Sequence, residues 1–170
     1  SLSITPFVEA LDDPSVRVKA AAIIALGRIG DKAAIPHLLK TEVPDSFRSP
    51  TFGEEGPHAT PNSDIILPHL AVRALVKLNA DKESLNAVGT ENSRIGLWAL
   101  RYMHSPAAVE GLIAKYNGAG TEDLELKQGV LTTLARLYTK EAPYDGSWWW
   151  GTRPDTHGPY YKSVLWSESD

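Results

Sequence analysis

The sequence contains no cysteine among its 170 residues. Such a chain forms no disulfide framework, offers no thiolate nucleophile or Cys-bound zinc site, and attaches no haem covalently. The longest uninterrupted apolar stretch, Ala20–Leu26, is far shorter than the roughly 18 residues that a membrane-spanning helix needs. Neither sign of charge dominates, because 17 basic residues stand against 21 acidic ones. We therefore expect no membrane span and none of the concentrated basic faces that bind nucleic acid.

What charge asymmetry there is lies in two segments without helical or strand periodicity. Residues 41–64 carry five acidic residues against one arginine, and residues 141–170 carry five acidic residues against two basic ones. The remaining sequence is periodic, and 42% of the chain is hydrophobic, which is typical of a globular protein. We expect a repeat region over residues 1–140 with an insertion at 41–64, followed by an irregular, Trp- and Tyr-rich cap over residues 141–170.

A short apolar pattern recurs four times along the chain. Steps of four, three, one and three residues place its members on one face of a helix. The leucines that anchor successive copies are 49, 25 and 34 residues apart, and removing the 24-residue insertion reduces the first spacing to 25. The four copies are Val18, Ala22, Ala25, Leu26 and Ile29; Leu67, Ala71, Ala74, Leu75 and Leu78; Gly96, Ala99, Leu100 and Met103; and Leu126, Val130, Thr133, Leu134 and Leu137.

Each copy follows a shorter helical stretch, at residues 4–11, 33–40, 83–88 and 106–116. Turn-forming residues separate these helices, among them the Asp13-Pro14-Ser15 run, Gly30 and the Ser105-Pro106 pair. The pattern predicts an all-α fold, an α-solenoid of about four stacked helix pairs. It also predicts near-complete burial of Leu26, Leu75, Leu100 and Leu134 on equivalent faces of the second helices.

The first copy carries a family resemblance. The segment LDDPSVRVKAAAIIALGRIGD, residues 11–31, resembles a HEAT repeat of the short type found in phycobilin-lyase-like proteins. That family usually opens its second helix with Val-Arg, whereas Val18-Lys19 stands there in this chain and Val16-Arg17 lies two residues earlier. The resemblance implies an armadillo-like, non-catalytic scaffold that binds proteins.

The C-terminal segment carries a second resemblance. The run YDGSWWWGTRPDTHGPYY, residues 144–161, followed by Trp166, is similar to a segment that closes the helical middle region of large secreted bacterial proteins. Those are the PVC-type haem-binding or membrane-bound dehydrogenase-like proteins, which join a propeller, HEAT repeats and a c-type haem domain. Neither a Cys-x-x-Cys-His motif nor a propeller is present, so neither haem binding nor dehydrogenase activity carries over. The resemblance implies a scaffold within a larger periplasmic or extracellular protein.

The insertion is the first candidate for a binding site, because long loops without secondary structure are often functional. Phe47, Phe52 and His58 are the candidate contact residues. One interpretation is a lid or partner-contact loop at an edge of the solenoid. The alternative, which we favour, is a surface decoration held down by its two phenylalanines.

The aromatic segment is the second candidate. Aromatic rings next to charged side chains are typical of surfaces that bind sugars or peptides. The alternative, which we favour, is that the segment caps the last helix pair, because a terminal repeat has no neighbour to cover its apolar face. The candidate surface comprises Trp148, Trp149, Trp150, Arg153, Asp155, His157, Tyr160 and Tyr161.

Signatures of catalysis or of cofactor binding are missing. The sequence contains no Gly-x-Ser-x-Gly elbow, Gly-x-Gly-x-x-Gly loop or phosphate-binding loop. His58, Asp64 and His69 lack the spacing of a helical metal site, so we expect neither metal nor cofactor. The sequence therefore predicts a non-catalytic scaffold that binds a protein partner or neighbouring domains of its own chain. A carbohydrate- or small-molecule-binding module that uses the aromatic segment is the alternative.

Overall fold

The computed structural model describes residues 3–45, 63–143 and 162–170. Within these ranges lie eight α-helices, three short 3₁₀ helices and one pair of two-residue strands. The helices are α1 (Thr5–Glu9), α2 (Val16–Ile29), α3 (Ile35–Leu38), α4 (Ile66–Lys77), α5 (Asp81–Ala87), α6 (Ser93–Leu100), α7 (Pro106–Gly118) and α8 (Leu124–Leu137). The 3₁₀ helices are Ala10–Asp12, Lys32–Ala34 and Ser63–Ile65, and the strands are β1 (Lys140–Glu141) and β2 (Ser163–Val164).

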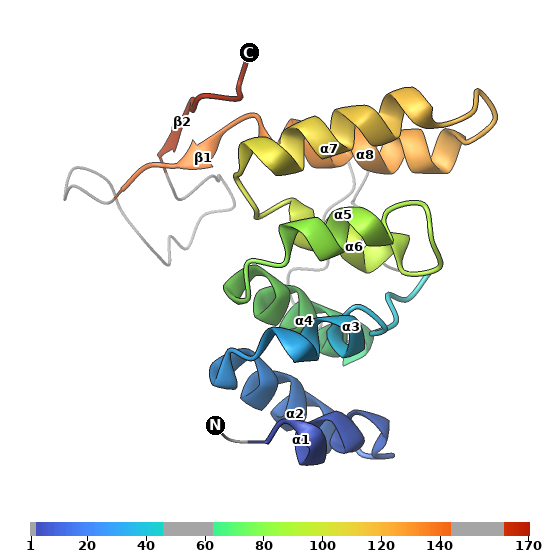
Figure 1. Cartoon of the computed structure of the whole chain (residues 1–170), viewed down its shortest axis with the longest axis vertical. Coiled ribbons are helices and arrows are strands. Elements are labelled where there is room, and N and C mark those ends of the chain that lie inside the picture. Colours follow the sequence, from blue (N-terminus) through green and yellow to red (C-terminus); the bar gives the residue numbers. More distant parts are fainter. Residues whose placement is uncertain (1–2, 46–62, 144–161) are drawn as a thin grey trace.

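The helices form pairs that stack along the long axis of the molecule, from α1 and α2 at one end to α7 and α8 at the other (Figure 1). Within each pair a first helix contacts a second one, as α5 does with α6 and α7 with α8. Between pairs, α2 packs on α4, α4 on α6, and α6 on α8. The all-α solenoid of four helix pairs is thus confirmed, and α2, α4, α6 and α8 are its second helices.

Several helices begin or end at the turn-forming residues, as the sequence predicts. Local hydrogen bonds and backbone conformations stabilise these helix ends. Gly30 ends α2 with a φ of 78°, in the left-handed region that glycine adopts at little cost. The Ser105 hydroxyl accepts a hydrogen bond from the Ala108 amide at 3.2 Å and caps α7. A carboxylate oxygen of Asp13 accepts from the Ser15 amide at 2.7 Å, directly before α2. These boundaries are therefore encoded locally.

Small residues let neighbouring helices approach closely. A Cβ atom added to Gly27 of α2 would lie 2.9 Å from the Cβ of Ala74 in α4. A Cβ added to Gly96 of α6 would lie 2.7 Å from the backbone oxygen of Ser84 in α5. Both distances are shorter than a Cβ atom normally approaches another heavy atom, so alanine at either position would force the helices apart. These two close contacts therefore require glycine. Gly96 lies one turn before the repeat leucine Leu100, so this small position of the repeat is where α5 and α6 approach each other.

Burial of the repeat leucine follows the predicted pattern in the first three helix pairs. Leu26, Leu75 and Leu100 are completely buried, as predicted. Leu134 is only partly buried, which corrects the prediction for the fourth copy. The reason is that no further helix pair follows α8 in the described part of the chain. Val18, another member of the repeat pattern, is 39% exposed.

Candidate interaction surface on the second helices

The candidate binding residues named from the sequence lie outside the described residues. This holds for both the insertion and the aromatic segment, so their roles stay predictions. The residues concerned are Phe47, Phe52 and His58, and Trp148, Trp149, Trp150, Arg153, Asp155, His157, Tyr160 and Tyr161.

The described residues instead form two grooves on the second helices. One groove, of about 690 Å³, runs along α2 and α4 and reaches Tyr102 just after α6; we call it the α2–α4 groove. The other, of about 980 Å³, lies between α6 and α8, and we call it the α6–α8 groove. The ring centroids of His69, from the first groove, and Trp98, from the second, are 6.3 Å apart, so the grooves are neighbours.

The α2–α4 groove combines an apolar floor with cationic walls. Ile24 of α2 is 38% exposed there. Arg28, Arg73 and Lys77 are exposed side chains that line the groove. No acidic side chain is among its lining residues. Such a surface favours a negatively charged ligand that also carries apolar groups.

The α6–α8 groove differs in charge. Its lining contains Glu91, Glu122, Asp123 and Glu125 as well as arginine, so both signs are present. Leu97 and Trp98, which line the same groove, are at most 7% exposed. This groove therefore has no single electrostatic preference.

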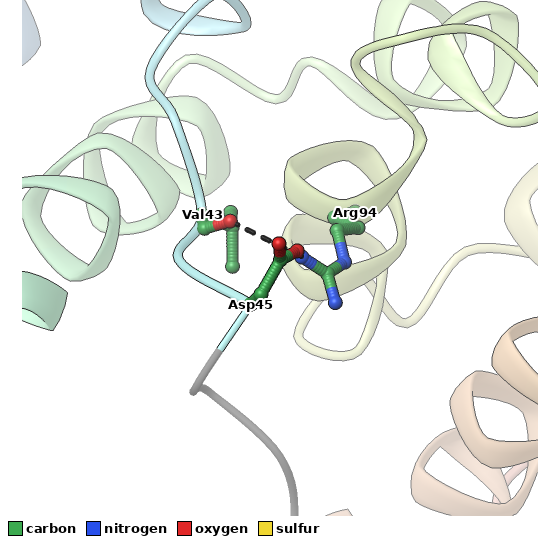
Figure 2. Close-up of polar contacts among 3 residues, drawn as sticks. All are labelled: Val43, Asp45 and Arg94. Atoms are coloured by element: carbon green, nitrogen blue, oxygen red, sulfur yellow. Dashed lines mark hydrogen bonds and ion pairs between the residues drawn. The ribbon is translucent and has the colours of Figure 1, made fainter.

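The segment that leaves α3 is tied to the start of α6 (Figure 2). Arg94 forms an ion pair with Asp45, and its Nη1 also donates a hydrogen bond to the Val43 carbonyl oxygen at 3.4 Å. Asp45 is fully exposed and the Arg94 side chain is 43% exposed, so solvent screens the pair. The contact places the beginning of the insertion beside the α6–α8 groove, which Val43 also lines.

Arg101, directly after α6, has a pKa that its surroundings shift. Burial lowers the pKa of its guanidinium below the ordinary value, and the nearby positive charge of Arg136 lowers it further, while Tyr102 acts in the opposite direction. The Nε atom is buried and has no hydrogen-bond partner among the described residues. The guanidinium remains charged at neutral pH, because an arginine pKa starts from a very high value.

Three cations of the second helices occupy one repeat position. Two residues after the repeat leucine stand Arg28 in α2, Lys77 in α4 and Arg136 in α8, and Tyr102 occupies the same position after α6. Cations in the last turn of a helix interact favourably with its dipole, which accounts for Arg28, Lys77 and Arg136. The sequence prediction missed the α2–α4 groove, and extending the repeat alignment by two residues would have found Arg28 and Lys77 but not Arg73.

The C-terminal residues contact the end of α8. The indole Nε1 of Trp166 donates a hydrogen bond to the Leu137 carbonyl oxygen at 2.7 Å, and the ring meets His104 edge-on at 5.3 Å. The backbone nearby forms the antiparallel β1–β2 pair, in which Lys140 is opposite Val164. Trp166 is half-buried by these contacts. The partner of His104 Nε2 is the Thr139 carbonyl oxygen, 2.9 Å away.

Metal-binding geometry and membrane-spanning segments can be checked only for the described ranges. Among residues 3–45, 63–143 and 162–170, no three His, Asp or Glu side chains cluster as metal ligands would. His69, one member of the triplet weighed from the sequence, contacts Trp98 instead. No helix in the same ranges has the length and apolar character needed to cross a bilayer.

Comparison with known proteins supports the class that this fold defines. The family model described as HEAT repeats matches residues 3–49, which include α1, α2 and α3. A comparison with curated proteins finds no match to this chain. The chain thus has an α-solenoid fold of the HEAT type, and HEAT repeats are in general scaffolds for protein interaction. The fold does not identify the partner.

Proposed function

We propose that this chain is a non-catalytic HEAT-repeat scaffold that holds a protein partner, or a neighbouring domain of its own polypeptide, against the second helices. The observation that carries the proposal is the pair of adjacent grooves on helices that share one continuous core. Leu26, Leu75 and Leu100 belong to that core and are completely buried. A surface formed on such helices is rigid, and a rigid surface loses little conformational entropy when a partner binds.

A photo-cross-linking experiment in the producing cells tests this function. We place p-benzoylphenylalanine at position 24, in the α2–α4 groove, and in a separate variant at position 113. Ile24 and Ile113 are matched in exposure, at 38% and 46%, but Ile113 lies on the first helix α7. We expect covalent adducts to protein from position 24 and few from position 113. Adducts from neither position would contradict the scaffold proposal, and equal adducts would contradict the choice of face.

The proposal also places the module within a larger extracytoplasmic protein. This part rests on the similarity of residues 144–161 to the closing segment of the helical region in secreted PVC-type proteins. Sequencing the complete gene tests it. A flanking export signal together with propeller or haem-motif sequence would support it, and a gene that encodes neither would contradict it.

A carbohydrate-binding module is the second candidate function. The observation in its favour is the concentration of Trp148, Trp149 and Trp150 next to Arg153, since aromatic rings and cations together suit sugar recognition. Isothermal titration with oligosaccharides that a glycan array selects tests this function. Binding that the Trp149→Ala variant abolishes would favour it over the scaffold, whereas the absence of any glycan ligand would exclude it.

A further inference from the structure

The α2–α4 groove has more cationic charge than its own fold requires. Arg28 and Lys77 lie in the last turns of α2 and α4, where they stabilise the helix dipoles. Arg73 lies one turn earlier in α4, and the dipole gives no reason for a cation there. None of these three side chains has an ion-pair partner among the described residues, whereas Arg94 of the neighbouring groove is paired with Asp45. Three unpaired cations that surround one groove repel each other, and a bound anion would remove that cost.

The groove also exposes aliphatic surface between these cations. Ile24 is 38% exposed, and Leu70 and Val76 are half-buried along the same lining. Gly27 and Ala74 lie at the bottom, where α2 and α4 approach too closely for larger side chains. A simple inorganic anion would leave this apolar surface in water. A ligand with both carboxylates and aliphatic side chains would cover the floor and pair with the walls.

We infer that the α2–α4 groove binds a segment of a partner protein that is acidic and carries aliphatic side chains. This inference rests on the proposed scaffold function and specifies its partner. The aliphatic side chains of the segment lie over Ile24 and Val76, and its Asp or Glu carboxylates face Arg28, Arg73 and Lys77. The α6–α8 groove does not share this preference, because its lining includes four acidic residues.

A display selection with the whole chain and a random peptide library tests the inference. Peptides of about 12 residues, which extend over roughly 40 Å, are long enough to follow the groove. We expect the enriched sequences to combine Asp or Glu with Leu, Ile or Val. Enrichment of basic or uncharged sequences, or the absence of any enriched sequence, would overturn the inference.

Matched neutral variants then locate the binding site of the enriched peptide. Arg73→Gln combined with Lys77→Gln removes two cations from the groove, and Lys32→Gln combined with Lys82→Gln removes two exposed cations that lie outside it. At about 0.15 M salt, where screening limits long-range effects, we expect the first variant to weaken binding at least about tenfold. The control variant should change the dissociation constant less than about twofold, because neither of its side chains lines the groove. Equal effects of the two variants would overturn the assignment of the groove.

Two further measurements separate the acidic peptide from other occupants. Ile24→Asn should weaken the binding of the peptide about threefold to tenfold, since a contact between aliphatic side chains is lost. A single-stranded DNA oligomer should bind more weakly than the peptide and should be insensitive to Ile24→Asn. DNA that binds as tightly as the peptide would show a general polyanion surface and overturn the inference. Self-association of the chain would also overturn the inference if the peptide disrupts it, because a second copy of the chain would then be the occupant of the groove.

The outcome separates this inference from the proposed function. A peptide that binds independently of Arg73 and Lys77 contradicts the acidic-segment inference but leaves the scaffold function supported. Absence of cross-links from both positions 24 and 113 in cells contradicts the scaffold function itself. Circular dichroism and thermal unfolding of each variant confirm that these exposed substitutions leave the fold intact.

Discussion

The repeat leucine is buried to different extents in the middle of the stack and at its C-terminal end. Leu75 of α4 and Leu100 of α6 are completely buried, and in each case the second helix of a following pair packs on the helix that carries the leucine. Leu134 of α8 occupies the equivalent position and is only partly buried. In a solenoid, each repeat is stabilised by its own helices and by its immediate neighbours. The comparison indicates that a following helix pair, and not the leucine itself, decides how completely a repeat leucine is buried.

The largest expected effect tests that conclusion directly. Leu75→Ala should lower the free energy of unfolding by about 2–5 kcal/mol, because it leaves a cavity that the packed helices cannot close. Leu134→Ala should cost about half as much or less, since part of that side chain is already in water. Urea denaturation followed by circular dichroism measures both. Equal losses would contradict the explanation that α8 lacks a neighbour.

Glycine-to-alanine substitutions sharpen the comparison, because the change in the free energy of unfolding should have opposite signs in the two regions. Gly96→Ala places a Cβ against the backbone oxygen of Ser84, which cannot move without shifting α5, so we expect a loss of about 1–2 kcal/mol. At Gly129 in α8 the added Cβ would meet the Cδ1 atom of Leu97 at 2.8 Å. That atom is the end of a flexible side chain, so the higher helix propensity of alanine should give a gain of up to about 1 kcal/mol.

Thermal unfolding of the two variants, each compared with the unmodified chain, is the measurement. Destabilisation by Gly129→Ala as large as that by Gly96→Ala would show that α8 is packed as tightly on α6 as α6 is on α5.

Trp166 is the residue through which the C-terminal segment can compensate for the missing neighbour of α8. Trp166→Ala removes the hydrogen bond to Leu137 and the edge-on contact with His104. We expect a loss of about 1–2 kcal/mol, less than for a fully buried tryptophan. Trp166→Phe keeps the ring contact and removes only the hydrogen bond, so it should cost less. An unchanged stability of Trp166→Ala would argue against a capping role for the C-terminal segment.

Removal of a buried hydroxyl in the middle of the stack should give a smaller change, and it should stabilise the fold. Ser84 is completely buried, and its Oγ has no hydrogen-bond partner among the described residues. Ser84→Ala should therefore stabilise the fold by about 1 kcal/mol, because the cost of burying an unpaired hydroxyl disappears. The midpoint of urea unfolding should rise at an unchanged slope. A lower midpoint would mean that the hydroxyl has a partner.

The smallest effect is expected at the ion pair of Figure 2. Asp45→Ala should leave the unfolding midpoint unchanged within error, because the carboxylate is fully exposed and exposed pairs contribute little. Arg94→Ala serves as the comparison, since it also removes the hydrogen bond to Val43. A marked loss of stability in Asp45→Ala would show that the ion pair anchors the insertion to α6.

Much of this architecture is predictable from the sequence because the responsible interactions are local. The end of α2 at Gly30 depends on a backbone conformation that glycine adopts readily, and the start of α7 depends on a hydrogen bond from Ala108 to Ser105. Each interaction spans only a few residues, so the sequence around it is sufficient. The periodic placement of Leu26, Leu75 and Leu100 likewise indicates which side of each second helix faces the core.

Three features depended on contacts between residues far apart in the sequence, and only the tertiary structure decided them. The partial exposure of Leu134 reflects which helices lie beside α8, and the pairing of Arg94 with Asp45 joins residues 49 positions apart. The clustering of Arg28 with Arg73 and Lys77 arises because α2 packs on α4 across the intervening insertion. A sequence specifies each of these side chains and its helix. Which charges share a groove, and which leucine lacks a neighbour, follow from packing, because packing determines which distant surfaces exclude water from one another.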